Sequence, residues 1–482
     1  PSPMASRSAA KAARSWKARD DPLHPVAPTL ELTPLRGATM IGAPGAAQRP
    51  TRIRYLVIAL IFLITTINYA DRATFSMAGS SASAELGLDS VTMGYILSAF
   101  AWSYVIGQIP GGALLDRFGT RQIYAAAIAI WSIFTFFQGF VGLIAGLPVV
   151  ASLFAMRFLV GFAEAPSFPG NARIVAAWFP ASERGTASAI FNSAQYFSLV
   201  AFAPLMGWLA HSFGWRSVFY AMGGFGVLAA LVFVGFIDSP VRHKLINQAE
   251  LDHIEQGGGV IRLEEAGKRP ATFTWTNVRQ LLTNRMLVGV YLGQYCINTL
   301  TYFFVTWFPI YLVKDRGLTI LQAGFSAALP AIFGFLGGIL GGYLSDRLLA
   351  RTGSLTLARK LPLLIGMILA TSIIGCVYVE QEWMIVAIMS LAFFGKGVAS
   401  LGWAVVSDVS PKELAGLTGG VFNTFGNAAG IVTPIAIGYL VGASGSFDTA
   451  LIYVGAHCVL TILAYFVIVG RIERVELKQV QP

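Results

Sequence analysis

Long apolar stretches separated by short polar segments dominate the chain. Crossing the hydrocarbon core of a bilayer, roughly 30 Å thick, takes about 20 mostly apolar residues in an α-helix. Twelve stretches meet this requirement. The first six are Tyr55–Ala78, Met93–Leu115, Gln122–Leu143, Leu147–Phe168, Thr186–Leu209 and Ser217–Ile237. The second six are Met286–Leu312, Leu321–Leu344, Leu361–Val379, Trp383–Val406, Gly416–Val441 and Ala450–Val469. The pattern predicts an all-α integral membrane protein with two sets of six transmembrane helices.

The segments between these stretches divide the chain into five parts. Residues 1–50, rich in Ala, Ser, Pro and Arg, should form a disordered basic tail or an upstream extension, with an organellar transit peptide as the alternative. Two six-helix bundles are expected over 51–237 and 286–470, joined by a mixed-charge linker over 238–285 and followed by a tail over 471–482. With both ends in the cytoplasm, the short inner loops carry nine Lys and Arg and the short outer loops three. This bias predicts cytoplasmic termini and a cytoplasmic linker.

Composition supports a membrane protein. Hydrophobic residues make up 55% of the chain and charged residues 12%, about half of the roughly 25% usual in soluble domains. The net charge of +10 lies mainly in the tail and the short loops, so it does not indicate nucleic-acid binding. Cys296, Cys376 and Cys458 stand singly in apolar stretches without metal-ligand spacing. We therefore expect lipid as the surroundings and neither a metal nor a cofactor.

A polar motif recurs at the same place in each set of stretches. Gly-x-Leu-x-Asp-Arg-x-Gly-x-Arg follows the second stretch, and a shorter copy follows the eighth. The residues concerned are Gly112, Asp116, Arg117, Gly119 and Arg121, then Asp346 and Arg347. Such a repeat indicates a duplicated transporter in which the halves alternate access. We expect Asp116 to accept from a neighbouring helix N-terminus and the arginines to form a cytoplasmic gate; the simpler alternative is a loop that only sets topology.

Five ionisable residues lie within or at the end of apolar stretches: Asp71, Arg72, Arg157, Glu164 and Lys396. Charge at membrane depth is costly and usually marks a substrate or proton pathway. Three cations and two acids suit a pocket that binds an anion and carries protons.

Helical spacing assigns partners to these residues. Asn68, Tyr69 and Arg72 share one face of the first stretch, where arginine can hold a carboxylate with two parallel hydrogen bonds. Arg157 and Glu164, seven residues apart, should share a face of the fourth stretch, so that a proton and a cation compete for the acid. The alternatives are an interfacial Asp71–Arg72 pair and a static Arg157–Glu164 ion pair.

The second half supplies further polar groups. Lys396, Ser400 and Trp403 are spaced to form one stripe on the tenth stretch, with Lys396 as a second anion contact opposite Arg72; snorkelling to the interface is the alternative. Tyr104, Gln195, Gln294, Asn298 and Asn423 complete the set. Amides that both donate and accept suit a polyol, although each could instead join helices.

Several sequence segments carry a family resemblance. They are Asn68–Thr74, Met93–Phe100, Gly161–Pro169, Asn171–Phe179, Glu183–Leu199, Phe393–Gly397 and Gly419–Asn423. Across about residues 51–475 the chain resembles the anion:cation symporters of the major facilitator superfamily, and most of all the bacterial D-glucarate/galactarate permeases. The repeated polar motif also resembles the signature of that superfamily.

The resemblance implies a twelve-helix fold of two pseudo-symmetric halves and proton-driven uptake of a sugar acid by alternating access. It places a multi-pass monomer in a bacterial inner membrane, with H⁺ as the coupling ion. It also assigns roles: substrate contacts at Tyr69, Arg72, Tyr104, Gln195, Gln294, Ser400, Trp403 and Asn423, and proton handling at Asp71 and Glu164, with Arg157 as the modulating cation. Related galactonate-type carriers have a neutral residue at the position of Lys396, so an extra cation agrees with a dicarboxylate. Two acids would permit two protons per dianion.

Other activities remain as alternatives. Within the same family these are carriers of galactonate, a hexuronate, an aromatic acid or phosphate. A multidrug proton antiporter of the same fold is disfavoured, because its pocket should carry acidic and aromatic side chains rather than three cations. A membrane enzyme or receptor is disfavoured because no nucleophile triad, metal-ligand cluster or phosphate loop is visible.

Overall fold

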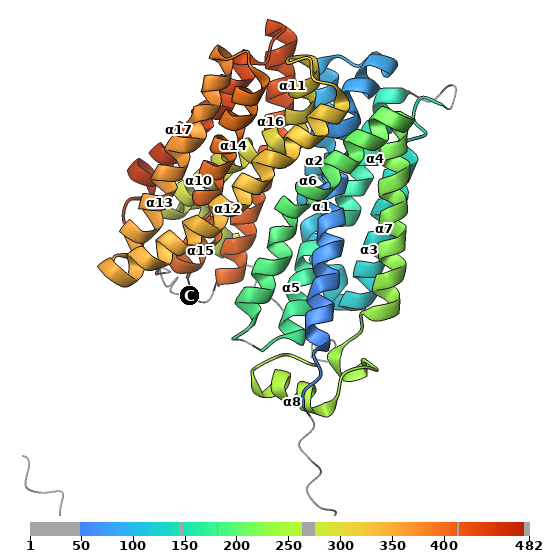
Figure 1. Ribbon diagram of the computed structural model, residues 1–482. Coiled ribbons are helices and arrows are strands. Elements are labelled where there is room, and N and C mark those ends of the chain that lie inside the picture. The colour runs from blue at the N-terminus through green and yellow to red at the C-terminus, as the bar shows by residue number, and fades with distance from the viewer. Residues whose placement is uncertain are drawn as a thin grey trace, which may run out of the picture. The chain divides into compact units, whose positions relative to one another are not determined.

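The computed structural model describes residues 49–143, 146, 148–180, 182–262, 275–411 and 414–476, and they contain no β-strand. Most of the predicted N-terminal tail, residues 263–274 of the linker and residues 477–482 lie outside the described residues. The helices form two groups, shown in Figure 1 in blue to green and in yellow to red. We call them the N-terminal half (α1–α7) and the C-terminal half (α10–η4).

The N-terminal half contains α1 (Ile53–Leu86), α2 (Ser90–Phe118), α3 (Thr120–Gln138), α4 (Val149–Glu164), α5 (Ser167–Trp178), α6 (Arg184–Phe213) and α7 (Arg216–Phe236). The linker carries a short 3₁₀ turn, η1 (Pro240–Arg242), and the helices α8 (Gln248–Gln256) and α9 (Trp275–Thr283). The C-terminal half contains α10 (Arg285–Thr306), α11 (Phe308–Lys314), α12 (Ile320–Thr352), α13 (Leu355–Ala370), the 3₁₀ segment η2 (Thr371–Tyr378), α14 (Glu382–Val398), α15 (Gly402–Val409), α16 (Ala415–Ser444), α17 (Asp448–Leu463) and the π-helical η4 (Ala464–Val469).

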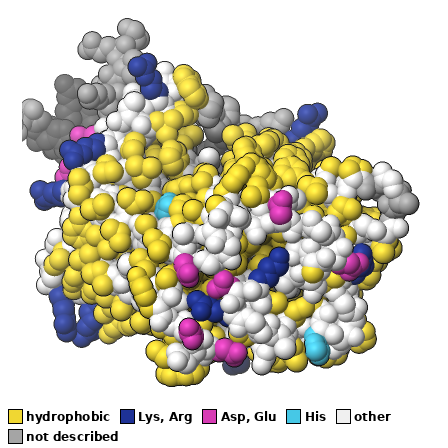
Figure 2. Space-filling model, turned by 90° about the horizontal axis from the view of Figure 1, so that it is seen from above, with side chains coloured by type: hydrophobic (Ala, Val, Ile, Leu, Met, Phe, Trp, Pro, Cys, Tyr) yellow, Lys and Arg dark blue, Asp and Glu magenta, His cyan; other side chains and the backbone are white. Residues whose placement is uncertain are grey.

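Ten helical segments of the described chain are long and apolar enough to cross a membrane, and α10 with α11, bent by 50°, would make an eleventh. The third predicted stretch forms α3, which is not among them. Its first turn contains Arg121 and Gln122, and these polar side chains lower its hydropathy. Apolar side chains cover much of the periphery (Figure 2), as expected for a surface in contact with lipid tails.

The fourth and tenth predicted stretches are each broken into two helices. The fourth continues past its predicted end at Phe168, because α5 runs on to Trp178. Within α5, Arg173 is paired with Asp116. Its break contains Pro166, which has no N–H to donate. The tenth breaks between α14 and α15, at residues 399–401. Broken helices at corresponding places in two halves are typical of transporters, where irregular backbone lines a binding site.

The two halves touch mainly through α2 with α16 and α6 with α12. We call the end of the bundle where α1 begins the Ile53 end and the opposite one the Gly87 end. A Cβ on Gly94 of α2 would lie 2.6 Å from the carbonyl oxygen of Pro434 in α16. A Cβ on Gly324 of α12 would lie 2.7 Å from that of Ala203 in α6. The halves are therefore in backbone contact toward the Gly87 end.

The Ile53 end is organised differently. Ion pairs there join residues of the same half or attach the linker to it, as in Arg121 with Asp238 and Arg359 with Asp408. The linker helix α8 is held to the N-terminal half by Glu250, which is fully buried and accepts from the Thr51 hydroxyl at 2.6 Å and from Arg54 at 3.0 Å. Within the described residues we find no ion pair between the halves at this end. The halves are therefore in close contact at the Gly87 end, whereas no ion pair joins their described residues at the Ile53 end.

Candidate substrate and proton-coupling site

Arg72 lies at the centre of the polar cluster in the N-terminal half. Its Nε donates to Glu164 Oε2 at 3.1 Å, and its Nη2 donates to Asn68 Oδ1 at 3.1 Å, one helical turn back. The guanidinium also stacks over three rings, with its carbon 4.5 Å from the centroid of Tyr69, 4.7 Å from Tyr104 and 4.9 Å from Phe100. Since guanidinium has five N–H donors, these contacts orient the group and leave donors for an anionic ligand.

Glu164 therefore pairs with Arg72 rather than with Arg157, the partner expected from helical spacing. The Nη2 of Arg157 is 3.4 Å from the backbone carbonyl oxygen of Arg72, and its guanidinium carbon lies 5.5 Å from the centroid of Phe75. The two residues are on the same helix, α4, but Glu164 is its last residue. A pair between helices was not visible from the spacing within one helix.

Asp71 points away from the Arg72 cluster. Its carboxylate is buried, and neither oxygen has a hydrogen-bond partner among the described residues. The charged or polar groups around it are Trp131 of α3, Arg157 and Glu164. The alternative of an interfacial Asp71–Arg72 pair is not found, because Arg72 pairs with Glu164. The two acids of the cluster thus occupy different surroundings, one holding Arg72 and the other beside Trp131.

Lys396 is a buried cation of the C-terminal half. Only 5% of its surface is exposed, and no carboxylate pairs with it in the described part of the chain. Its Nζ lies 5.3 Å from the ring centroid of Phe393 and 5.5 Å from that of Tyr196, which belongs to α6 of the other half. An unpaired ammonium at the contact between halves has the chemistry of an anion site.

The predicted stripe of Lys396, Ser400 and Trp403 is wrong, because the helix does not continue through it. α14 ends at Val398 and α15 begins at Gly402. The Ser400 hydroxyl donates to the Lys396 carbonyl oxygen at 2.8 Å. Trp403 is 57% exposed and packs edge-on against Phe422 of α16. Ser400 and Trp403 therefore follow the break instead of continuing the face of Lys396.

The predicted amides form a chain of hydrogen bonds between α10 and α16. Gln294 donates to Asn298 at 3.4 Å, and Asn298 donates to the Gly426 carbonyl oxygen at 3.0 Å. Two glycines leave room for these amide side chains. A Cβ on Gly402 of α15 would lie 2.5 Å from Gln294 Oε1, and one on Gly426 of α16 would lie 2.8 Å from Asn298 Nδ2. Gln195 stands apart, with its Nε2 on the Asn192 carbonyl oxygen of its own helix.

Asn423 connects the halves. Its Nδ2 donates to Oε1 of Gln108 in α2 at 3.1 Å. Gln108 was not among the predicted site residues, nor was Tyr302, whose hydroxyl donates to Asn427 Oδ1 at 2.9 Å. A signal was present in both cases, because Gln108 follows Tyr104 and Tyr302 follows Asn298 by four residues, one turn along the same helix face.

The repeated motif lies at the Ile53 end. Asp116 accepts from the side chain of Arg173 of α5, and its bond to a helix N-terminus stays a prediction. Arg121 donates to Asp238 at 3.1 Å and to the Val234 carbonyl oxygen at 2.8 Å, and Asp346 lies 3.6 Å from Arg359. Arg117 lies over the ring of Phe118 and Arg347 over that of Tyr343, and neither forms an ion pair with a described residue.

The two glycines of the motif differ in their surroundings. Gly119 has φ 87°, a left-handed conformation that favours glycine at the turn between α2 and α3. Gly112 has open space around it. The conformation of the turn accounts for Gly119, whereas packing does not account for Gly112.

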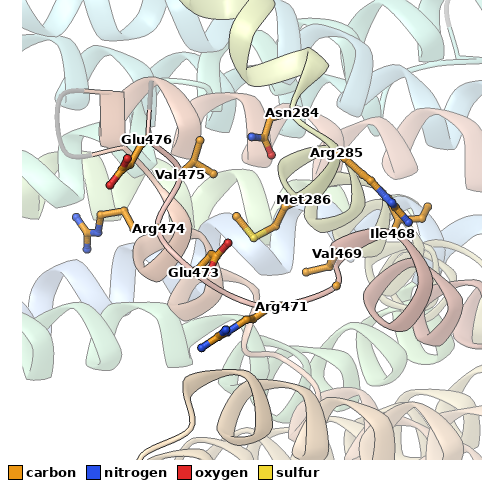
Figure 3. Close-up of a pocket in the computed structure, with 11 residues that line it drawn as sticks. Asn284, Arg285, Met286, Ile468, Val469, Arg471, Glu473, Arg474, Val475 and Glu476 are labelled. Carbon is orange, nitrogen blue, oxygen red and sulfur yellow. The ribbon is translucent and has the colours of Figure 1, made fainter. Parts of the chain in front are cut away.

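A hollow of about 730 Å³ lies where η4 meets the start of α10, shown in Figure 3. Arg285, Arg471 and Arg474 line it together with Glu473 and Glu476. None of the predicted substrate or proton residues contributes to its wall. The glutamates offset two of the three arginines, so the hollow does not have the charge of an anion site.

Comparisons with known proteins agree with this arrangement. Residues 61–358 match the family model described as Major Facilitator Superfamily. The chain is 56% identical over 441 residues to the "Probable galactarate/D-glucarate transporter GudP" of Escherichia coli K12, covering 91% of this chain and 98% of that protein. It is 58% identical over 434 residues to the protein of the same name from Bacillus subtilis, covering 90% and 95%.

More distant similarity is found to a "D-galactonate transporter" of Escherichia coli O6:H1, 41% identical with 90% and 99% coverage. In fold, the chain matches the crystal structure of a D-xylose-proton symporter with a TM-score of 0.65 at 16% identity, covering 86% of this chain and 97% of that one. The predicted fold class is confirmed. The protein is a multi-pass membrane transporter, not an enzyme, and the chain belongs to the Major Facilitator Superfamily.

Proposed function

We propose that this protein is a proton-coupled symporter that imports a sugar diacid, D-glucarate or galactarate, by alternating access. The observation that carries the proposal is the pair of buried cations in separate halves, Arg72 and Lys396. Arg72 is oriented by Glu164 and three rings, whereas Lys396 has no acid partner in the described chain. Two anchors match the two carboxylates of a diacid, and the relatives at 56–58% identity carry that substrate in their names.

Polar side chains in both halves suit the hydroxyl groups of such a substrate. Gln294, Asn298 and Asn423 present amides along α10 and α16, and Tyr69 and Tyr104 flank Arg72. Each amide both donates and accepts, as a sugar hydroxyl does. Substrate would bind between the halves and exchange some of these contacts for its own.

Protons would enter the cycle through Asp71 and Glu164. Carrying a dianion into a negative interior costs about 2.3 kcal/mol per charge per 100 mV. Glu164 holds Arg72, and Asp71 is buried without a hydrogen-bond partner in the described chain. Two acids that each take one proton would make import electroneutral, with Arg157 as the modulating cation.

The cellular setting follows from the same reasoning. The positive charge of the short loops on the side of the Ile53 end supports a cytoplasmic position for that end, the linker and both termini. We place the protein in a bacterial inner membrane as a monomer, with H⁺ as coupling ion and no cofactor. The conformation described would then be open toward the cytoplasm.

The test is uptake of labelled D-glucarate by purified protein in proteoliposomes, with and without an inward proton gradient. Gradient-driven uptake that galactarate blocks and galactonate spares supports the diacid symporter. Uptake of galactonate or a hexuronate in place of glucarate would overturn the substrate assignment while retaining the symporter. Net inward movement of negative charge during glucarate uptake would overturn the two-proton stoichiometry.

A carrier of galactonate is the second candidate. A relative named for that substrate is 41% identical, less than the relatives named for the diacids. A monoacid has no second carboxylate to neutralise Lys396. The buried Lys396 therefore favours the diacid.

A further inference from the structure

Unpaired polar atoms collect along one face of α3. Trp131, Thr135 and Gln138 are spaced i, i+4 and i+7, so they share a face. All three are buried, with at most 1% of each exposed. The hydroxyl of Thr135 and Oε1 of Gln138 have no hydrogen-bond partner among the described residues, and the indole N–H of Trp131 faces the Asp71 carboxylate without closing a hydrogen bond of normal geometry. We call these three residues the α3 polar face.

The lack of bonds is not a property of α3 as a whole. On another face of the same helix, the Ser132 hydroxyl donates to the Ile128 carbonyl oxygen at 2.6 Å, one turn back. Thr65 and Thr306 make the same bond in α1 and α10. The equivalent acceptor for Thr135 is the carbonyl oxygen of Trp131, and Thr135 does not bond to it. Its hydroxyl is thus available to another molecule.

The α3 polar face leads to Asp71. Trp131 lies beside the Asp71 carboxylate, whose two oxygens are also unpaired, and Nε of the nearby Arg157 is unpaired as well. From Trp131 to Gln138, the last residue of α3, the helix rises by about 10 Å. The face therefore runs from the buried acid to the Gly87 end.

Buried polar atoms without partners are costly, because they lose their hydrogen bonds to water. Buried water usually resolves this cost, because one molecule makes about three hydrogen bonds to such atoms. We propose that water molecules bind along the α3 polar face and carry protons between the Gly87 end and Asp71. This deepens the proposed function and rests on its proton coupling.

The consequence is a proton route separate from the substrate route. Arg72 faces Tyr69, Tyr104 and Phe100, whereas Asp71, the next residue, faces α3. At the Gly87 end the backbone contacts at Gly94 and Gly324 close the path between the halves. Protons moving along α3 would reach Asp71 through the N-terminal half without crossing that closed contact.

The first test asks whether water is bound. X-ray hydroxyl-radical labelling of the full-length protein in nanodiscs, read by mass spectrometry, marks side chains next to bound water. We expect Trp131 to be oxidised at least about fivefold faster than Trp307, a tryptophan equally removed from solvent. Trp307 is the matched control because it is 2% exposed and its indole N–H donates to the Pro434 carbonyl oxygen. Equal protection of the two tryptophans would overturn the proposal.

The second test asks whether the water carries protons. Thr135→Val removes the hydroxyl at nearly constant shape, and Gln138→Leu removes the amide. Each should lower gradient-driven uptake by about tenfold while sparing substrate counterflow, which needs no net proton transfer; Ser132→Ala, whose hydroxyl is already bonded, should change neither. Unchanged gradient-driven uptake in both variants would overturn the proton role. If wild type shows no gradient-driven uptake, the proposed coupling fails, and the labelling still decides whether water is bound.

Discussion

Arg72 of α1 and Glu164 of α4 form a buried ion pair, with Nε 3.1 Å from Oε2. The pair joins two helices at a point where α4 ends and α5 begins. Removing one partner of such a pair leaves an uncompensated buried charge, which is strongly destabilising. Protonation of Glu164 would weaken its hold on Arg72, and an anionic substrate would supply the missing charge. In the proposed cycle the pair would therefore link proton binding to anion binding.

Glu164→Gln should separate these two events. Glutamine keeps an oxygen that can accept from Arg72 but cannot take up a proton. We expect gradient-driven uptake to fall by at least about tenfold, while substrate counterflow persists because Arg72 remains in place. Both activities are measured in the same proteoliposomes. Retention of full gradient-driven uptake would exclude Glu164 as a coupling acid.

Lys396→Met should change the choice between diacids and monoacids. A hydrogen bond to a charged group contributes about 1.5–3 kcal/mol, so loss of the ammonium should weaken glucarate binding by about 10- to 100-fold. Galactonate, with one carboxylate, should lose much less. Competition against labelled glucarate measures the ratio, and Lys314→Met, at the end of α11, serves as the control. An equal loss of binding affinity for glucarate and galactonate would show that Lys396 does not bind the second carboxylate.

Gly94→Val should disturb the closed Gly87 end. Its Cβ would lie 2.6 Å from the Pro434 carbonyl oxygen, so α2 and α16 must move apart. Overpacking of this kind costs about 1–3 kcal/mol, enough to favour the conformer open at the Gly87 end by about tenfold. Spin labels at Ala84→Cys and Ser444→Cys, one in each half, should report a longer distance.

The control for this experiment is Gly224→Val, because that helical glycine has open space around it. It should leave the spin-label distance unchanged. A Gly94→Val distribution identical to that of the control would mean that the contact at Pro434 does not hold the Gly87 end closed.

Glu250→Gln should release α8 from the N-terminal half. Glu250 is fully buried and ion-paired with Arg54, and breaking a buried pair by removing one charge costs about 3–5 kcal/mol. Amide hydrogen exchange over residues 248–256 should rise, whereas Glu255→Gln, at an exposed position, should leave it unchanged. Unaltered exchange in Glu250→Gln would show that other contacts hold α8.

Acid should weaken the same attachment through Glu183, which accepts from Arg54 Nε at 3.0 Å and lies 3.4 Å from His253 of α8. Burial, which raises the pKa of Glu183, is outweighed by its hydrogen bond from Arg54, so the pKa lies below the usual value. A lowered pKa contributes stability that is present above the ordinary glutamate value of about 4.3. This contribution is lost as the pH falls through the lower value in the folded protein. Exchange over 248–256 should therefore rise on acidification, and less so in Glu183→Gln.

The sequence by itself determined most of the membrane architecture, because hydrophobic length and the position of Lys and Arg are local properties. It predicted the two sets of spans and the position of the repeated motif, and it singled out Asp71, Arg72, Arg157, Glu164 and Lys396 because charge is rare in apolar stretches. The proposed substrate class also rests on sequence, through long segments that match the relatives.

Tertiary structure alone decided which groups meet. Spacing within one helix paired Arg157 with Glu164, but the neighbouring helix brought Arg72 closer. Spacing also joined Lys396 to Trp403, but a break in the helix separated them. The bond between Gln108 and Asn423 and the approach of Trp131 to Asp71 join residues far apart in the sequence. Such contacts depend on how helices pack, and periodicity along a single helix carries no information about its neighbour's rotation or depth.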